Sequence, residues 1–472
     1  MKPDAAYTER RVAHWDFVAQ NFQRWRAGNR YHARLTRIFE SLIPPGQRIL
    51  EIGCAQGDLL AALKPSYGVG VDFSSGMIAA ARQKYPGLTF READAYELQL
   101  DETFDVIILS DLINDLWDVE TVFRRILPLT TPQTRILLNY YSRVWAPLLA
   151  ITEKLGLSTP KLSQNWLVVE DVNTLLYLAG FEVLRNQPEI LWPLPLRPLS
   201  ALFNRWLVKL WPFHHFALTN VTIARPIPGT PPADPPRVSV IVPARNEAGN
   251  IAEILRRTPE MGAGTELIFV EGHSSDNTYE TIRQELPRSG RCGKLFQQTG
   301  KGKGDAVRLG FAQASGQVLM ILDADITVPP EDLPKFYEAL IAGKGDFING
   351  VRLVYPMHDQ AMRLFNFLGN KFFSLAFSWL LRQPIKDTLC GTKVLWKRDY
   401  ELIAANRAYF GDFDPFGDFD LLFGAARLNR KIVDLPVRYG ARTYGTTNIQ
   451  RWSHGVLLLR MAAFAAVRVK FI

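Results

Sequence analysis

The sequence predicts an α/β protein made of two domains, and three observations lead to this prediction. The chain has 472 residues, 47% of them hydrophobic, which suffices for about two to four cores. Each half opens on a strand pattern followed by a helix pattern. A proline-rich segment, Pro226–Pro236, separates the halves, and because proline fixes φ and lacks a backbone donor, neither helix nor sheet is expected through it. We therefore predict domains at residues 1–225 and 237–472, joined by a semi-rigid linker at 226–236.

Composition and charge exclude several classes of protein. The charged fraction of 22% and the aromatic fraction of 11% exclude a largely disordered chain. A net charge of +8 on a chain of this length does not indicate a partner that is a nucleic acid. Cys54, Cys292 and Cys390 lie far apart and form no zinc or disulfide pattern. The polar start and the lack of a long apolar run predict a cytoplasmic protein without a clear transmembrane span.

A glycine-containing turn in the first half indicates a site for a nucleoside-like ligand. Gly53 and Gly57 follow a buried strand pattern, and they let the backbone turn sharply and approach a ligand. About twenty residues later a second strand pattern ends in Asp72, whose carboxylate suits ribose hydroxyls. A third strand pattern is followed by Asp94. The four strands are predicted at Ile49–Ile52, Tyr67–Val71, Leu88–Arg91 and Phe104–Asp111.

The segments LEIGCAQGD, GVGVD and ADA, in this order, resemble the class I S-adenosylmethionine-dependent methyltransferases over roughly Ile38–Arg225. The resemblance implies a Rossmann-like fold in which the glycine turn holds the methionine part of the methyl donor. It implies that Asp72 binds the ribose and that Asp94 lies near the adenine amine. The residues expected to bind S-adenosylmethionine are Glu51, Gly53, Gly57, Asp72 and Asp94.

This half departs from the family pattern at two positions. Ala55 replaces the middle glycine of the turn, and Asp115 stands where many relatives carry a histidine. Asp115 is either a changed base or part of a changed loop, and these departures leave open a non-catalytic scaffold. Tyr140, Tyr141 and Trp145 follow the predicted fifth strand, where they either line the pocket of an unidentified methyl acceptor or belong to the core.

Four strand-end motifs in the second half indicate a metal-assisted site for a phosphorylated ligand. RVSVIVPARNE ends at Pro243 and a polar turn, and ELIFVEGHSSDNT ends at Glu271. GKGKGDAV is a glycine- and lysine-rich turn without the spacing of a Walker loop. VLMILDADI is a strand pattern ending in Asp323 and Asp325. Side chains two apart on a strand share a face, so these carboxylates are expected to hold Mg²⁺ or Mn²⁺ beside substrate phosphates.

This set resembles family-two glycosyltransferases with the nucleotide-diphosphosugar (GT-A-like) fold, over nearly all of Arg237–Asn448. Within that family it looks most like the dolichyl-phosphate mannosyltransferase and polyprenyl-phosphate glycosyltransferase type. The resemblance implies that Asp323 and Asp325 hold the metal. The residues implied for the nucleotide sugar are Pro243, Arg245, Glu247, Glu271, Asp276, Lys303 and Asp323.

Later motifs of the same family place further charged residues. Arg352, together with Asp418 or Asp420 of the segment GDFDLL, is expected in the catalytic machinery, the acids as base or orienting group. Lys393 of DTLCGTK and Arg442 of the RxYG segment are expected to bind phosphate.

Two departures accompany these motifs. Glu271-Gly272 replaces the usual Asp-Asp, which leaves the choice of nucleotide open. Thr327 replaces a glutamine that relatives often place two residues after the Asp-x-Asp.

Two apolar segments of the second half are predicted to lie in a membrane interface as amphipathic helices. Ala361–Leu381 carries its polar residues on one arc, with leucine, phenylalanine and tryptophan on the rest. Gly455–Ile472 is apolar with Arg460, Arg468 and Lys470, whose charges would attract anionic lipid. A membrane-spanning role is rejected because the motifs on either side of the first segment must build one site. The alternative is that both helices pack against protein.

Together these patterns predict a bifunctional enzyme of glycan or cell-envelope biosynthesis. A sugar would pass from a nucleotide-sugar donor to an acceptor, polyprenyl phosphate being favoured, at the inner face of the cell membrane. The N-terminal half would methylate an unidentified acceptor with S-adenosylmethionine. The alternatives are a soluble glycan or protein as sugar acceptor, and an N-terminal half that serves as a non-catalytic scaffold.

Overall fold

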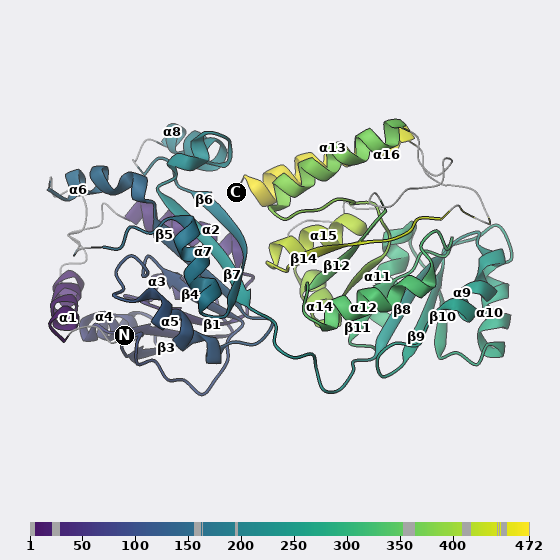
Figure 1. Cartoon of the computed structure of the whole chain (residues 1–472), viewed down its shortest axis with the longest axis horizontal. Helices are drawn as coiled ribbons and strands as arrows, with labels where there is room; N and C mark the ends of the chain where they lie inside the picture. The colour runs from purple at the N-terminus through teal and green to yellow at the C-terminus, as the bar shows by residue number, and fades with distance from the viewer. Residues whose placement is uncertain are drawn as a thin grey trace. The chain divides into compact units, whose positions relative to one another are not determined.

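The computed structural model describes residues 5–20, 29–154, 162, 164–193, 197–352, 364–407, 417–440, 442, 444 and 451–471. The chain divides into two compact units (Figure 1). Unit 1 comprises Met1–Ile227 with Phe471–Ile472, and unit 2 comprises Pro228–Lys470. Each unit contains a seven-stranded sheet with helices, which confirms the predicted α/β class with two parts. The exact domain boundaries at 225 and 237 stay a prediction.

The sheet of unit 1 has the strand order β3-β2-β1-β4-β5-β7-β6. Its first five strands are parallel, and β7 pairs antiparallel with both β5 and β6. The central strands are buried on both faces, which explains why they read as continuous aliphatic runs in the sequence. The strands are β1 (Arg48–Ile52), β2 (Tyr67–Asp72), β3 (Thr89–Glu92), β4 (Val106–Ser110), β5 (Arg135–Tyr141), β6 (Phe181–Glu189) and β7 (Thr219–Pro226).

Helices cover the sheet of unit 1, and two hydrophobic clusters lie between helices and strands. One cluster contains Phe123 of α5 and Leu176 of α7, and the other contains Phe39 of α2 and Ile78 of α4. The carboxyl ends of the parallel strands therefore meet at one edge of a fixed scaffold. The helices are α1 (Ala5–Gln20), α2 (Asn29–Leu42), α3 (Asp58–Ala62), α4 (Ser75–Lys84), α5 (Val119–Ile126), α6 (Ala146–Lys154), α7 (Val169–Leu178) and α8 (Arg197–Ala201).

The sheet of unit 2 has the strand order β10-β9-β8-β11-β13-β12-β14. β13 is antiparallel to both of its neighbours, and the other pairs are parallel. The carboxyl ends of β8, β9 and β11 therefore lie at one edge, next to the start of β13. The strands are β8 (Val238–Ala244), β9 (Thr265–Glu271), β10 (Gly293–Gln297), β11 (Val318–Ile321), β12 (Phe347–Val351), β13 (Lys393–Trp396) and β14 (Ile432–Pro436).

Two hydrophobic clusters also hold unit 2 together. One joins Phe311 of α11, Phe419 of α15 and Phe377 of α13, and the other joins Ile254 of α9 to Phe336 of α12. The helices are α9 (Ile251–Arg257), α10 (Thr278–Arg288), α11 (Lys303–Gln313), α12 (Leu333–Ile341), α13 (Leu364–Leu381), α14 (Lys397–Ala405), α15 (Asp418–Arg427) and α16 (Arg451–Ala465).

The structure differs from the prediction in the extent of three local elements. Pro226 belongs to β7, opposite Phe181, because a strand tolerates proline at its last residue. β11 ends at Ile321, so Asp323 and Asp325 lie in the turn that follows the strand and not on one strand face. Of the predicted GKGKGDAV turn, Lys303 and the residues after it form the first turns of α11.

The two predicted interfacial segments form helices, but their polar side chains are partly used inside the protein. In α13 the hydroxyls of Ser374 and Ser378 donate to Ile385 O, at 2.8 and 2.9 Å, so the polar arc does not simply face water. Lys470, predicted to attract lipid, is buried and donates to Trp379 O at 2.8 Å. Leu375 remains 72% exposed on α13. In the part of the chain that the structure describes, no helix is long and apolar enough to cross a membrane.

Candidate functional site

The glycine turn of unit 1 follows β1 and has a backbone that suits few side chains. Gly53 and Gly57 have φ of +73° and +77°, and a Cβ on Gly57 would lie 2.6 Å from the Phe90 ring. Ala55 also has a positive φ, of +45°, so the residue that replaces the family glycine keeps a left-handed conformation. Its amide donates to Asp72 Oδ2 at 2.9 Å. The end of β2 therefore holds the turn that follows β1.

Two aspartates sit at the carboxyl ends of neighbouring strands, as predicted. Asp72 ends β2 and accepts a second backbone hydrogen bond, from Ser74 N to Oδ1 at 2.9 Å. Burial raises the pKa of Asp72, and the two amide donors oppose that rise. Asp94 follows β3, and its Oδ1 accepts from Tyr96 N at 2.9 Å. Both carboxylates are thus held in fixed positions by the main chain.

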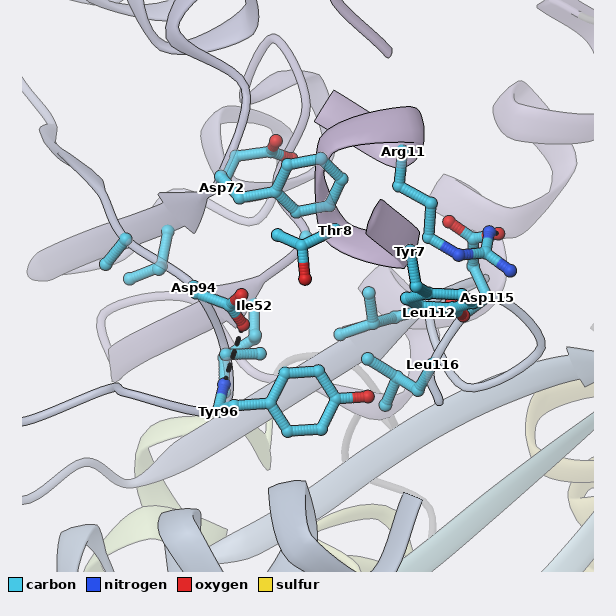
Figure 2. Close-up of a pocket in the computed structure, with 15 residues that line it drawn as sticks. Tyr7, Thr8, Arg11, Ile52, Asp72, Asp94, Tyr96, Leu112, Asp115 and Leu116 are labelled. Atoms are coloured by element: carbon cyan, nitrogen blue, oxygen red, sulfur yellow. Dashed lines mark hydrogen bonds and ion pairs between the residues drawn. The ribbon is translucent and has the colours of Figure 1, made fainter. Parts of the chain in front are cut away.

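These residues line a pocket of about 510 Å³, counting its open mouth (Figure 2). In the close-up, Asp72 lies across the pocket from Arg11 and Asp115, and the Tyr96 ring lies below them. The wall between them is mostly apolar. The lining residues are Tyr7, Thr8, Arg11, Ile52, Gly53, Val71, Asp72, Phe73, Ala93, Asp94, Ala95, Tyr96, Leu112, Asp115 and Leu116.

The N-terminal helix α1 forms one wall of this pocket. Arg11 makes an ion pair with Asp115, and Trp15 Nε1 donates to Asp115 Oδ2 at 3.0 Å. The Tyr7 hydroxyl donates to the Asp115 main-chain oxygen at 2.9 Å. Asp115, left open in the sequence as base or loop residue, therefore binds α1 to the loop after β4.

Some predicted residues of this half lie outside the pocket lining. Glu51 is buried within β1 and accepts from Leu60 N at 3.1 Å, which places it under the turn. Tyr140 and Tyr141 lie in β5 itself, contrary to the prediction that they follow the fifth strand. Tyr140 is buried in the core, and Tyr141 stacks on Tyr31.

In unit 2, Asp323 and Lys303 form an ion pair with an N–O distance of 2.5 Å. Burial acts to raise the pKa of Asp323, but the nearby Lys303 ammonium outweighs it and lowers the pKa below its usual value. Gly391 lies against this pair, and a Cβ there would come within 2.6 Å of Asp323 Cγ and overlap both charged groups. A side chain at this position would therefore require the Asp323 carboxylate or the Lys303 ammonium to move.

Arg442 holds the second carboxylate of the Asp-x-Asp motif. Its guanidinium donates to Asp325 Oδ2 at 2.7 Å and to Glu247 Oε1 at 3.0 Å. The other Asp325 oxygen accepts from the amide and hydroxyl of Thr327, at 3.1 and 2.8 Å. Thr327, where relatives often carry glutamine, therefore fixes the orientation of Asp325. Gly445 of the predicted RxYG segment lies outside the described residues.

Two more charged pairs lie near Asp323. Lys393 is fully buried and lies 3.0 Å from Asp418 Oδ1. Arg352 binds Asp387 with two hydrogen bonds, of 2.7 and 2.9 Å. Charges on Lys393 and Arg352 both act to lower the pKa of Asp323, and Asp418 acts to raise the pKa of Lys303. The structure therefore brings residues of five separate motifs into one charged cluster.

Asp420, the other candidate base, is turned away from that cluster. It pairs with Arg407 at 2.8 Å, although it lies only two residues after Asp418 on α15. Successive helical residues are about 100° apart, so residues two apart project from different faces. Asp418 is consequently the candidate that lies beside Lys303 and Lys393.

The residues predicted to contact the nucleotide lie at the ends of β8 and β9. Pro243 is within the last residues of β8, and Arg245 after it is exposed. Glu271 Oε1 accepts from Ser274 N at 2.5 Å, and its Oε2 accepts from Gln297. Asp276 Oδ1 accepts from Thr278 N at 3.0 Å and so supports the turn. These acids shape the loops beside the charged cluster.

Comparison with known proteins identifies the parts of the chain. Residues 239–400 match the family model of glycosyl transferase family 2, and residues 49–133 match a methyltransferase domain model. The chain combines a methyltransferase domain with a family 2 glycosyl transferase domain. Both predicted resemblances are confirmed by these matches.

Individual relatives match parts of the chain. The dolichol-phosphate mannosyltransferase of Pyrococcus furiosus is 30% identical over 220 residues, covering 45% of this chain and 59% of that protein. The undecaprenyl-phosphate 4-deoxy-4-formamido-L-arabinose transferase of Edwardsiella ictaluri is 34% identical over 111 residues, covering 22% and 34%. A solved S-adenosylmethionine dependent methyltransferase from Mesorhizobium loti is 20% identical with a TM-score of 0.32, covering 40% and 96%. The chain thus spans less than two thirds of the curated relatives' length.

The methyltransferase pocket fits S-adenosylmethionine in its donor set. Gly53 presents bare backbone at the pocket wall, with a φ of +73° and with Leu112 packed 3.0 Å from where a Cβ would lie. Asp72 and Asp94 supply carboxylate oxygens for hydroxyl and amine hydrogens at the pocket wall.

The glycosyl transferase site offers two carboxylates for Mg²⁺ or Mn²⁺. Asp323 and Asp325 are hard oxygen donors of the kind these ions take, with phosphate oxygens completing the coordination. Both are paired with cationic side chains, so a metal would have to displace Lys303 and Arg442. Among the described residues no group of three or more His, Cys, Asp or Glu side chains forms a metal site.

Replacing Glu51 should make the free energy of unfolding of the methyltransferase domain less dependent on pH. Burial raises the pKa of Glu51 to about 8, far above its value in an unfolded chain. The native state then holds a proton that the unfolded state loses, so stability is full below about pH 4.5 and falls as the pH rises to about 8. Glu51→Gln removes this slope, which is about 1.4 kcal/mol per pH unit.

Thermal unfolding of the full chain from pH 5 to 8 measures this effect. Glu92→Gln makes the same change at an exposed position of β3 and serves as the matched control. Equal slopes for wild type and Glu51→Gln would contradict the prediction.

Sequence reasoning missed the contribution of α1 to the methyltransferase pocket. Tyr7 and Arg11 lie in a polar segment of mixed charge that shows no motif, and their contact with Asp115 depends on the folded chain. Tyr96 is also new. Its position two residues after the predicted Asp94 was a signal, because strand-end loops of parallel sheets line ligand sites.

Proposed function

We propose that the chain is a bifunctional enzyme of glycan or cell-envelope biosynthesis. Its glycosyl transferase unit would move a sugar from a nucleotide-sugar donor to polyprenyl phosphate, with Mg²⁺ or Mn²⁺. The two relatives described above are named for dolichol phosphate and undecaprenyl phosphate, and both are polyprenyl phosphates. The methyltransferase unit would transfer a methyl group from S-adenosylmethionine to an acceptor that the sequence and the structure do not name.

The charged cluster around Asp323 is the observation that carries the sugar-transfer proposal. A divalent cation at Asp323 and Asp325 would neutralise charge on a departing diphosphate. Lys303, once freed from Asp323, would face the same phosphates as a compact cation. Burial acts to lower the pKa of Lys303, but the neighbouring carboxylates of Asp323 and Asp418 outweigh it, so the pKa is raised. Lys303 therefore remains protonated when it separates from Asp323.

The acceptor side of the cluster has cations as well. Arg352 and Lys393 lie beside Asp387 and Asp418, where a phosphate group would compete for them. A phosphate acceptor is already an anion and needs little help from a base. Asp418 would then position Lys393 and would take a proton only from a hydroxyl acceptor.

In the methyltransferase unit, the residues bind and align and do little chemistry. The sulfonium of the donor is already activated, so the pocket needs to hold it in line with an acceptor atom. Asp72 and the Gly53 turn would hold the donor, and α1 would shield it from water at the wall formed by Tyr7 and Arg11.

Membrane association of unit 2 through α13 is part of the proposal. Phe372 and Leu375 are exposed on α13, while Phe377 on another face of the helix is buried. An apolar exposed face next to a buried one suits a helix in the bilayer interface. A polyprenyl tail stays in the bilayer, which would bring its phosphate to the cytoplasmic face.

The test is a labelled-product assay. The full chain is incubated with labelled sugar nucleotides, Mn²⁺ and undecaprenyl phosphate in detergent, and lipid-extractable label is measured. Label in the lipid fraction with at least one donor is expected. Label only on a soluble glycan or protein supplied as an alternative acceptor would overturn the lipid acceptor, and no transfer with any donor would overturn the activity.

A further inference from the structure

Unit 1 carries an exposed aromatic surface that the proposed catalysis does not use. It lies on α8 and the short turns after it, η4 (Leu202–Trp206), η5 (Leu207–Lys209) and η6 (Phe213–Phe216). Trp211 is 78% exposed and Phe216 54%, and Leu202, Leu210 and Phe213 are exposed as well. Large apolar side chains gathered in this way on the surface of a folded unit mark an interaction site.

A second exposed strip adjoins this aromatic surface. Trp145 Nε1, just before α6, donates to Phe216 O at 2.8 Å, so the start of α6 lies against η6. Along the same segment Val144, Leu148 and Ile151 are exposed. Both α6 and α8 lie at the upper edge of unit 1 in Figure 1. From here on, the aromatic surface means both strips together, residues 143–154 and 197–217.

The aromatic surface is held rigidly from behind. The Asn204 side chain accepts from Leu191 N and Trp192 N, at 2.7 and 2.6 Å, and donates to Trp192 O. Val208 packs in a small buried cluster with Leu191. Lys209 points inward as well, in a buried ion pair with Glu189. The inward side chains of Asn204 and Lys209 are thus bonded within unit 1, and the aromatic side chains of the outer face are left exposed.

The charge around the aromatic surface selects its partner. The sequence from 190 to 233 contains no Asp or Glu. Exposed cations flank the apolar side chains, namely Arg143, Lys154 and Arg205. Glu153 is the one acid of the two strips, and basic residues outnumber it. Tryptophan and phenylalanine bordered mainly by cations are typical of segments that lie in a bilayer interface with anionic headgroups.

We propose that the aromatic surface of unit 1 binds the face of an anionic lipid bilayer. Trp211, Phe213 and Phe216 would enter the headgroup region. Arg143 would contact lipid phosphates, as would the terminal NH groups of Arg205, whose Nε donates to Phe471 O at 2.8 Å. This contact is separate from the one proposed for α13 of unit 2, and it places the methyltransferase unit itself on the membrane. Its methyl acceptor would then be a molecule held at that surface.

Vesicle sedimentation with the full chain tests the proposal. It measures neither sugar transfer nor methyl transfer, so a failure of the lipid contact is distinguishable from a failure of the proposed activities. The vesicles are phosphatidylcholine with phosphatidylglycerol, or phosphatidylcholine alone. Trp211→Ser with Phe213→Ser should lower the partition coefficient on anionic vesicles about tenfold or more. The change should persist when Leu375→Ser removes the α13 contact. Tyr177→Ser, at a 68% exposed position of α7, is the matched control and should bind like wild type.

Three outcomes would overturn the proposal. The first is unchanged vesicle binding of the double variant, or of Trp211→Ser alone should the double variant fail to fold. The second is a wild-type dimer in sedimentation velocity that Trp211→Ser makes monomeric, which would assign the surface to a second copy of the chain. The third is equal binding of the wild type to neutral and anionic vesicles, which would contradict an anionic bilayer as the partner.

Discussion

Replacing Gly391 by alanine should lower sugar transfer by at least about a hundredfold. A Cβ at this position would overlap Asp323 Oδ2 and Lys303 Nζ, the two atoms at the centre of the charged cluster. Either the ion pair separates or the loop before β13 moves, and each displaces groups proposed to face the donor diphosphate. A displacement of about 1 Å at such a site costs about a hundredfold in rate.

The control separates this local effect from a general loss of fold. Gly229→Ala adds the same methyl group in unit 2 where no atom lies within 4 Å of it, and transfer should stay at the wild-type level. Overpacking at Gly391 should cost about 1–3 kcal/mol of stability at most, so thermal unfolding remains cooperative. Nucleotide-sugar binding, measured by calorimetry, should weaken together with the rate. Transfer within threefold of wild type would contradict the proposed site.

The positions of the strand-end residues follow from the sequence because parallel strands meet at one edge. Asp72 ends β2 and Asp94 follows β3, its neighbour in one sheet, whereas Glu271 ends β9 and Asp323 follows β11, the two strands on either side of β8 in the other. A strand pattern in the sequence with a polar residue at its end suffices to predict that these side chains lie at one edge of the sheet. The same rule failed at Asp325, since the strand ends at Ile321 and the carboxylate orientation depends on a turn with its own hydrogen bonds.

Contacts made by antiparallel or unpatterned segments could not be predicted in this way. Gly391 reaches Asp323 because β13 runs antiparallel beside β11, a pairing that no local period encodes. Arg11 reaches Asp115 through a helix whose sequence is polar and mixed in charge. In contrast, the separation of Asp418 from Asp420 could have been predicted from the sequence. A helix that begins at Asp418 places the two side chains on different faces.

Removing the Asp72 carboxylate should weaken S-adenosylmethionine binding about a hundredfold. Asp72 accepts from Ala55 N in the glycine turn and from Ser74 N at the start of α4, so it fixes two segments of the pocket at once. Its oxygens keep lone pairs for ribose hydroxyls. Asp72→Ala removes both the ligand contact and the support of a turn that holds Ala55 at positive φ. The loss of one charge-assisted hydrogen bond accounts for about 1.5–3 kcal/mol, which is about ten- to a hundredfold in affinity, and the turn adds to it.

Asp105→Ala provides the matched control for this change. Asp105 also accepts a backbone hydrogen bond, from Arg48 N at 2.8 Å, but it does so at the opposite end of β1 from the pocket. Calorimetric titration should therefore give wild-type affinity for Asp105→Ala and a strongly raised dissociation constant for Asp72→Ala. Equal affinities would mean that the carboxylate only supports the fold. Absence of S-adenosylmethionine binding by the wild type would favour the alternative in which this domain is a non-catalytic scaffold. A pocket that keeps its aspartates but binds no methyl donor cannot transfer a methyl group.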